Sequence, residues 1–313
     1  MNGAGTVANS LSTADLRGSA RRRRKEAIIH GVFLTAGSLS MVISVLIVVS
    51  LVGRAIDFLR LIPLSSLWSL GWFPRRGFFD VKTIIVGTLI VTGIAMLVAA
   101  PMGLGAAIYL SEYASARARR VLKPILETLA GIPSVVMGYF ALTFISPQLV
   151  QKLFSQATIF NLAATGIAVG ILVVPLVASV AEDAMYAVPV SIREASYGLG
   201  AKRASTAVRV VFPAAVSGIV AALILGASRA IGETMVVSIA AGGTGGSLFT
   251  VNPLGRGQTM TGAMASLATG SDAVRGAGGA YPSLFFVGTI LFLLTFALNV
   301  VSERFVRRVR RRY

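Results

Sequence analysis

Six long apolar runs divide this sequence and constrain its fold more than any other feature. Each is about 20 residues or longer, the length that a helix needs to cross a hydrocarbon core of about 30 Å. Hydrophobic residues make up 55% of the chain and charged residues only 13%, so we predict an all-α integral membrane protein with six transmembrane helices and no separate soluble domain. The predicted spans are residues 27–52, 83–110, 124–146, 159–181, 214–243 and 282–301.

The segments at the two ends of the chain are polar and basic. Residues 1–26 contain a Ser-, Thr-, Gly- and Ala-rich stretch and then the run RRRRK, and we expect a disordered basic N-terminus there. The apolar run that follows is longer than the ~7–15 residues of a signal-peptide core, which makes it the first span. We therefore predict one transmembrane domain over 27–305 and a basic tail over 306–313 that contacts anionic lipid.

An even number of spans puts both termini on one side of the membrane, and the distribution of Lys and Arg predicts which side. Segments on the terminal side carry 20 basic residues, and those on the opposite side carry 8. Because cytoplasmic segments are enriched in Lys and Arg, we predict that both termini are cytoplasmic. The same distribution accounts for the net charge of +17 without a nucleic-acid partner.

Residues that could support a metal site or enzyme chemistry are few. The chain has no cysteine and one histidine, His30. It has no G-x-x-x-x-G-K-[ST] motif, so we predict no phosphate-binding loop for ATP. Because residues for metal or enzyme chemistry are so few, we also predict no cofactor, no metal and no catalytic residue. The acids in and between the spans are scattered instead of clustered at metal-ligand spacing; they include Glu112, Glu127, Glu182, Asp183, Glu194 and Glu233.

The last outer connection, residues 244–281, is long and rich in glycine. Loops of this kind usually only connect elements. We therefore predict a loose connection there, with a mobile lid as the alternative.

Two opposite charges lie inside the fifth apolar run, ILGASRAIGETMVVSIAAGG. A charged side chain at the centre of a span costs about 2.5–3.5 kcal/mol on insertion scales. On one continuous helix, Arg229 and Glu233 would face the same side and pair. Two interpretations remain open, a structural ion pair and a transport path, and we favour the path because ionisable residues within membranes are commonly functional. Gly232 would let a helix or a substrate approach closely, and we include Thr234 in this candidate substrate-path group.

The fourth connection, residues 188–213, is patterned like a folded element. We predict a short helix over 191–199, a positive φ at Gly200 that turns the chain, and a second helix over 202–212 that Pro213 ends. The product is a helix–turn–helix on the cytoplasmic face. We expect four basic side chains to be exposed on it: Arg193, Lys202, Arg203 and Arg209.

This element resembles the cytoplasmic EAA motif of ABC importer permeases, which reads Glu-Ala-Ala, three residues, Gly, nine residues, then Ile-x-Leu-Pro. The matching positions here are Glu194-Ala195-Ser196, Gly200 and Val210-Val211-Phe212-Pro213. The spacing fits throughout, and Ser196, Val210 and Phe212 differ in identity.

The EAA resemblance implies that the element docks into a separate ATPase subunit and couples it to the membrane helices. The candidate coupling residues are Arg193, Glu194, Ala195, Gly200 and Pro213. Glu194 could cap the first helix or pair with a basic residue of the ATPase, and the sequence leaves both roles open.

Further stretches narrow the resemblance. GTLIVTGIAMLVAAPMGLGAAIYLSEYA, LETLAGIPSVVMGYFAL and RAIGETMVV are similar to the permeases of phosphate-specific ABC importers, and the GETM continuation resembles their PstC type. The resemblance implies a type I ABC importer permease fold in a bacterial or archaeal cytoplasmic membrane. It also implies a PstA-like second permease, two copies of a PstB-like ATPase and an external PstS-like phosphate-binding protein.

Phosphate chemistry gives the two intramembrane charges a role. The guanidinium of Arg229 offers paired donors to an oxyanion. The carboxylate of Glu233 could accept the proton that phosphate, unlike sulfate, retains near neutral pH, and would repel sulfate. A PstA-type permease and a permease for another oxyanion are the alternatives. A channel or secondary transporter without ATP is disfavoured by the coupling element.

Overall fold

The computed structural model describes residues 20–243, 245–270 and 278–310, which are mainly helical. Within these residues, four helices are long and apolar enough to cross a membrane, and two bent helix pairs raise that number to six if each pair is one span. This agrees with the predicted all-α membrane protein. The four long segments are Arg24–Leu61, Val81–Tyr113, Leu162–Tyr186 and Ala280–Arg304.

The chain forms two compact units, residues 1–50 and 51–313. The first unit contains most of helix α1 (Ala20–Leu61), and its apolar side chains are exposed. Residues 20–26 are helical, although we expected them to be disordered. The rest of the predicted N-terminus, residues 1–19, and residues 311–313 of the predicted tail lie outside the described residues.

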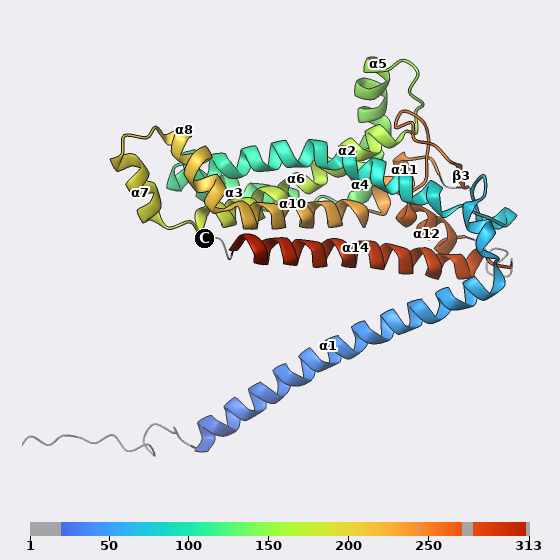
Figure 1. The fold of residues 1–313 in the computed structure, drawn as a ribbon, viewed down its shortest axis with the longest axis horizontal. Coiled ribbons are helices and arrows are strands. Elements are labelled where there is room, and N and C mark those ends of the chain that lie inside the picture. The colour runs from blue at the N-terminus through green and yellow to red at the C-terminus, as the bar shows by residue number, and fades with distance from the viewer. Residues whose placement is uncertain (1–19, 244, 271–277, 311–313) are drawn as a thin grey trace, which may run out of the picture. The chain divides into compact units, whose positions relative to one another are not determined.

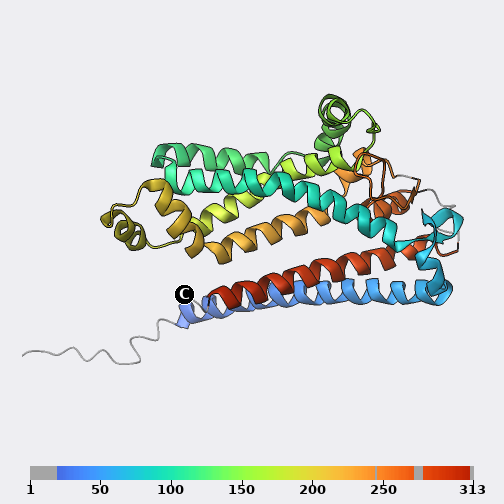
Figure 2. The same ribbon diagram turned by 45° about the horizontal axis from the view of Figure 1, so that its top comes forward.

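Four helices run side by side in the second unit: α2 (Val81–Ile108), α6 (Leu162–Tyr186), α10 (Val216–Ile231) and α14 (Ala280–Arg310) (Figures 1 and 2). Small residues let α2 and α6 approach closely. A Cβ atom at Gly170 would lie 2.8 Å from the carbonyl oxygen of Ala95, and one at Gly166 would lie 2.7 Å from the Cβ of Ile94. Small residues support such packing in membranes, where backbones must come close for helices to associate.

The predicted third span, 124–146, is wrong as a straight helix. Helix α3 (Ala116–Leu129) is strongly amphipathic and ends before Pro133, and α4 (Ser134–Phe140) begins after it. Proline disfavours the helical conformation in the residue before it and cannot donate a backbone hydrogen bond. The chain therefore bends by 81° between α3 and the segment that continues through η5 (Ala141–Val150) and α5 (Gln151–Leu153).

The predicted fifth span, 214–243, is also interrupted. Residue 214, where this span was predicted to begin, is instead the last residue of an earlier helical segment. That segment consists of α8 (Arg203–Thr206), η6 (Ala207–Val211) and α9 (Phe212–Ala214). The chain then bends by 74° between it and α10. Helix α10 ends at Ile231, and α11 (Met235–Ala240) begins beyond a short break. Arg229 and Glu233 are therefore not on one continuous helix, contrary to our expectation.

The end of the second unit that carries β3 and α12 lies opposite the end that carries α7 and α8 (Figure 1). A three-stranded antiparallel sheet in the order β2-β1-β3 stands there, with Trp72 of β1 fully buried. Its strands are β1 (Gly71–Phe73), β2 (Phe78–Phe79) and β3 (Ser247–Leu248), with the short helices η2 (Leu64–Trp68) and η3 (Pro74–Arg76) beside them.

The Gly-rich segment 244–281 is not the loose connection that we predicted. It contains helix α12 (Met260–Ala268), in which Met260 and Ala263 are fully buried. The carbonyl oxygen of Gln258 lies so close to Gly87 of α2 that a Cβ there would be 2.2 Å away. Its apolar residues and this close approach hold the segment against the bundle. Residue 244 and residues 271–277 lie outside the described part of the chain.

Candidate functional site

The helix–turn–helix predicted over 188–213 is present. Helix α7 (Val190–Gly198) follows Pro189, and Gly200 has a φ of +80°, as expected for the residue that turns the chain. The backbone N–H groups of Gly200 and Ala201 donate to the carbonyl oxygens of Tyr197 and Ser196. These bonds satisfy carbonyl groups at the end of α7, the usual role of a left-handed glycine after a helix.

Two details of this element differ from expectation. Pro213 does not end the second helix, because α9 continues to Ala214 and the chain bends at Ala215. Glu194 does not cap α7; within the described residues its exposed side chain has no hydrogen bond or ion pair. Glu194 and its exposed neighbour Ala195 thus present a free surface, together with exposed Lys202 and with the basic residues Arg203 and Arg209.

Ser196, which departs from the second alanine of the EAA pattern, joins the two helices of the element. Its hydroxyl lies 2.9 Å from the hydroxyl of Thr206 in α8, and Thr206 is fully buried. An alanine could not make this bond. The substitution therefore adds a polar contact across the turn at Gly200.

Arg193 is not exposed, contrary to our expectation. Only 14% of its side chain is accessible, and its Nη2 lies 3.0 Å from Oε1 of Glu112, of which 3% is accessible. Nε also donates to Oε1 of Glu112 at 3.3 Å, and Nη2 donates to the carbonyl oxygen of Met185 at 2.8 Å. Nη1 donates to the carbonyl oxygen of Val188. Arg193 therefore points away from solvent, and four of its five N–H donors have partners among these groups.

A second ionic cluster, which sequence reasoning missed, connects α3 with α6. Fully buried Glu182 accepts from Lys123 at 2.7 Å and pairs with Arg119 at 2.5 Å. Lys123 also pairs with Asp183, and the guanidinium of Arg119 lies 3.5 Å from the centroid of the Tyr186 ring. The sequence signal was an acidic pair at the end of an apolar span, but the basic partners are about sixty residues away and no local spacing relates them.

Arg229 and Glu233 come together even though α10 ends between them. Nη1 of Arg229 lies 3.5 Å from Oε2 of Glu233. The other carboxylate oxygen, Oε1, accepts from the backbone N–H groups of Thr234 and Met235, both at 3.1 Å, and more weakly from that of Val236 at 3.5 Å. Glu233 therefore occupies the break between α10 and α11 and satisfies the first N–H groups of α11, as an N-terminal cap does.

The two charges differ sharply in accessibility. The Glu233 side chain is 5% exposed and the Arg229 side chain 56%. A charge-assisted N–H···O bond is usually about 2.7–2.9 Å long, so the contact at 3.5 Å is loose. Among the described residues, this contact is the one polar interaction of the Arg229 side chain, which leaves most of its donors available to an anion.

Gly232 and Thr234, the other two residues of the predicted substrate-path group, lie in the same break between α10 and α11. Gly232 directly follows α10 as its C-terminal cap, and a Cβ there would meet only carbonyl oxygens of α10. Among the described residues, no other helix makes the close approach that we expected at this glycine. The Thr234 hydroxyl donates to the Gly232 carbonyl at 3.3 Å. The hydroxyl of Thr261, just inside α12, donates to the carbonyl of Glu233 at 2.7 Å. The break is thus fixed to α12, which keeps Glu233 in place beside Arg229.

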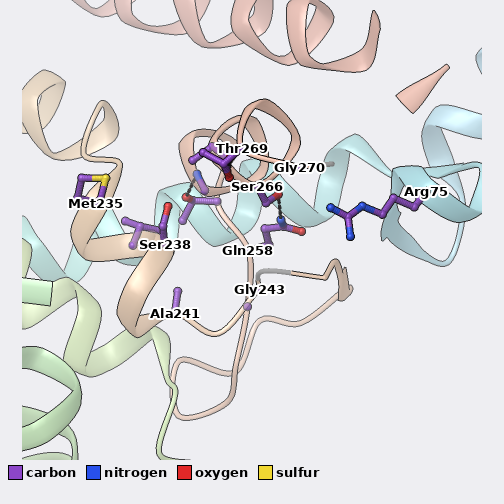
Figure 3. Close-up of a pocket in the computed structure, with 14 residues that line it drawn as sticks. Arg75, Met235, Ser238, Ala241, Gly243, Gln258, Ser266, Thr269 and Gly270 are labelled. Carbon is purple, nitrogen blue, oxygen red and sulfur yellow. Dashed lines mark hydrogen bonds between the residues drawn. The ribbon is translucent and has the colours of Figure 1, made fainter. Parts of the chain in front are cut away.

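A pocket of about 300 Å³ is lined by residues of α11 and α12 and of the segment between them. Figure 3 shows Gln258 and Ser266 joined by a hydrogen bond in its wall, with Arg75 reaching toward them from the region of the sheet. Neither Arg229 nor Glu233 lines this pocket. This pocket is therefore distinct from the predicted substrate-path group.

The chain is similar to known membrane transport components. The family described as "binding-protein-dependent transport system inner membrane component" matches residues 99–312. The probable ABC transporter permease protein YqgH of Bacillus subtilis is 36% identical over 214 residues, covering 64% of this chain and 69% of that protein. The phosphate transport system permease protein PstC of Pasteurella multocida is 30% identical over 286 residues, covering 85% and 87%.

A solved structure shares the fold. It is that of a bacterial alginate ABC transporter in complex with an alginate pentasaccharide-bound periplasmic protein. One of its chains aligns with a TM-score of 0.62 at 18% identity, over 91% of this chain and 97% of that one. At this identity the likeness concerns the fold alone, and it confirms the predicted type I ABC importer permease fold.

Proposed function

The chain belongs to the family of binding-protein-dependent transport system inner membrane components, and from that premise we propose that it is the PstC-type permease subunit of an ATP-driven phosphate importer. The observation that carries the proposal is the similarity to a phosphate transport system permease over 85% of the chain. The pairing of Arg229 with Glu233 adds a site whose charges suit an oxyanion. Permease subunits are not catalytic, so a separate subunit hydrolyses ATP.

The partners in this proposal follow from the same family. A PstA-like permease would complete the translocation pathway, two copies of a PstB-like ATPase would bind the cytoplasmic elements, and a PstS-like protein would deliver phosphate from outside. The exposed surface of α7 supports the ATPase contact. Glu194 and Ala195 are accessible there, and Gly200 has open space around it.

The proposed substrate path runs past Arg229. Its exposed guanidinium would bind phosphate oxygens through paired N–H donors. Oε1 of Glu233 is taken by the N–H groups of α11, so Oε2 is the oxygen that would accept the proton of phosphate. Carboxylate repulsion would then disfavour a fully ionised oxyanion at the same position.

Co-purification tests the proposed assembly. The chain is expressed with PstA-like, PstB-like and PstS-like proteins of the same organism, and ATP hydrolysis by the purified complex is measured with and without phosphate-loaded binding protein. We expect a stable complex whose hydrolysis rises when loaded binding protein is added. Failure of the ATPase to co-purify, or hydrolysis indifferent to the loaded binding protein, would count against the assignment.

The proposed orientation has both termini in the cytoplasm, and cysteine labelling tests it because the native chain has no cysteine. Asn252 is exposed near the sheet and Arg203 is exposed at the coupling element. In intact spheroplasts, an impermeant thiol reagent should modify Asn252→Cys and should modify Arg203→Cys only after the membrane is opened. The opposite labelling pattern would reverse the orientation.

A further inference from the structure

Helix α7 makes little apolar contact with the membrane helices. None of its residues is buried, so no apolar core of its own holds it to the bundle. An open pocket of about 510 Å³ lies between the start of α7 and the adjoining parts of α6 and α10. Its lining includes Ile192 of α7, Ala184 of α6 and Gly218 of α10.

The polar contacts of Arg193 span this poorly packed junction. The side chain leaves α7 and reaches Glu112, which lies 81 positions earlier in the sequence. Two further N–H groups donate to carbonyl oxygens, those of Met185 near the end of α6 and Val188 in the connection that follows. One guanidinium thus joins α7 to the ends of two membrane helices.

Glu112 occupies a special place in α2. It lies in the π-helical segment η4 (Tyr109–Tyr113) that ends α2, and such wide turns often occur at functional sites. Its Oε1 accepts from Nε and Nη2 of Arg193 and from the hydroxyl of Ser111 at 2.9 Å. A charge pair that is this little exposed is weakly screened and holds its geometry.

We propose that Arg193 and Glu112 form the mechanical link that carries movement of α7 to α2, and that Arg193 does not bind the ATPase. Arg193 is a positioning residue in this scheme, since it acts through Glu112 and the ends of α2 and α6. The inference rests on the proposed function in one respect, that the ATPase moves α7. A movement of the end of α2 can be passed on to the other helices of the bundle, because α2 packs closely against the glycines of α6.

Three substitutions test the link. Arg193→Gln removes the charge and most donors, Arg193→Lys keeps the charge but not the fork of donors, and Glu112→Gln keeps the size and one acceptor oxygen. Arg120→Gln and Glu127→Gln are matched controls, because both residues are exposed on α3. Phosphate uptake and ATP hydrolysis are measured together in vesicles that contain the complete complex.

We expect the amount of phosphate taken up per ATP hydrolysed to fall on the order of tenfold in Arg193→Gln and Glu112→Gln, a size typical of coupling between distant sites. Arg193→Lys should fall less, and the controls should match the wild type. Parallel loss of uptake and hydrolysis in an assembled complex would overturn the proposal, as would a wild-type ratio. If Arg193→Gln does not assemble, the same ratio is determined on the isosteric Glu112→Gln.

Amide hydrogen exchange separates this inference from the proposed function, since it needs no transport. In the intact complex, Arg193→Gln should speed exchange in Val190–Gly198 by about tenfold and leave Leu162–Tyr186 unchanged. Unaltered exchange in α7 would refute the link even if phosphate transport is normal. Faster exchange in α7, together with a wild-type complex that transports no phosphate, would refute the proposed substrate and leave the link supported.

Discussion

Replacing Arg229 with lysine is expected to reduce phosphate transport by roughly tenfold to a hundredfold, although the positive charge is kept. An ammonium lacks the paired donors of a guanidinium, and a hydrogen bond to a charged group is worth about 1.5–3 kcal/mol. Uptake of radiolabelled phosphate into vesicles with ATP inside measures the effect. Arg256→Lys is the matched control, because Arg256 is an exposed arginine in another segment. Equal losses in the two variants would show that the Arg229 geometry is unimportant.

Glu233→Gln tests the second half of the same site without removing the cap of α11. A glutamine oxygen can still accept from the N–H groups of Thr234 and Met235, whereas the charge that repels a fully ionised oxyanion is lost. We expect slower phosphate transport and weaker discrimination against sulfate. The measurement is stimulation of ATP hydrolysis by each anion without the binding protein, which would otherwise filter the substrate first.

A structural role for the pair makes a different prediction, and the geometry indicates how to test it. Exchanging the two charges is uninformative, because an arginine at position 233 could not accept the N–H groups of α11. The double variant Arg229→Gln with Glu233→Gln keeps the cap and removes both charges. A neutral pair often replaces an ion pair at little cost to stability, so normal transport by this variant would assign the pair to structure. We expect transport to be lost.

Gly200→Val is expected to abolish coupling between ATP hydrolysis and uptake while membrane insertion stays normal. Gly200 has a φ of +80°, and holding a β-branched residue there costs about 1–3 kcal/mol. The turn would relax, and the surface formed by α7 and α8 would change. Co-purified ATPase and ATP-driven uptake measure the outcome.

Two further substitutions separate backbone strain at Gly200 from simple crowding. Asparagine tolerates a positive φ better than other residues with side chains, so Gly200→Asn should retain much of the activity. A Cβ atom at Gly198 would also meet nothing within 4 Å. Gly198 lies in α7 with a helical backbone, however, so Gly198→Val adds the same bulk without the strain. Activity in Gly200→Val equal to that in Gly198→Val would refute the argument from φ.

Local rules predicted the helix–turn–helix of residues 188–213 well, because its structure depends on residues close in sequence. Pro189 and Gly200 delimit α7 where proline and glycine chemistry places them. Apolar length likewise located the long helices α2, α6 and α14. These features need no knowledge of distant partners, and this is why they could be inferred from one sequence.

The errors arose where distant groups decide the outcome. Arg193 was expected to face solvent, but Glu112 is too far along the chain for any spacing rule to relate the two. The apolar run 214–243 suggested one helix, since a hydropathy pattern carries no information on the capping of α11 by Glu233. The run 124–146 was assigned by hydropathy in the same way, although Pro133 within it was a visible signal for the break.

Phosphate uptake by the reconstituted wild-type complex tests the central claim most directly. Vesicles containing the permease pair and the ATPase, with ATP inside and phosphate-loaded binding protein outside, are followed with radiolabelled phosphate and, separately, radiolabelled sulfate. The account predicts accumulation of phosphate that requires internal ATP and is strongly reduced by Arg229→Lys. Accumulation of another oxyanion in place of phosphate, or phosphate entry that does not depend on ATP, would contradict it.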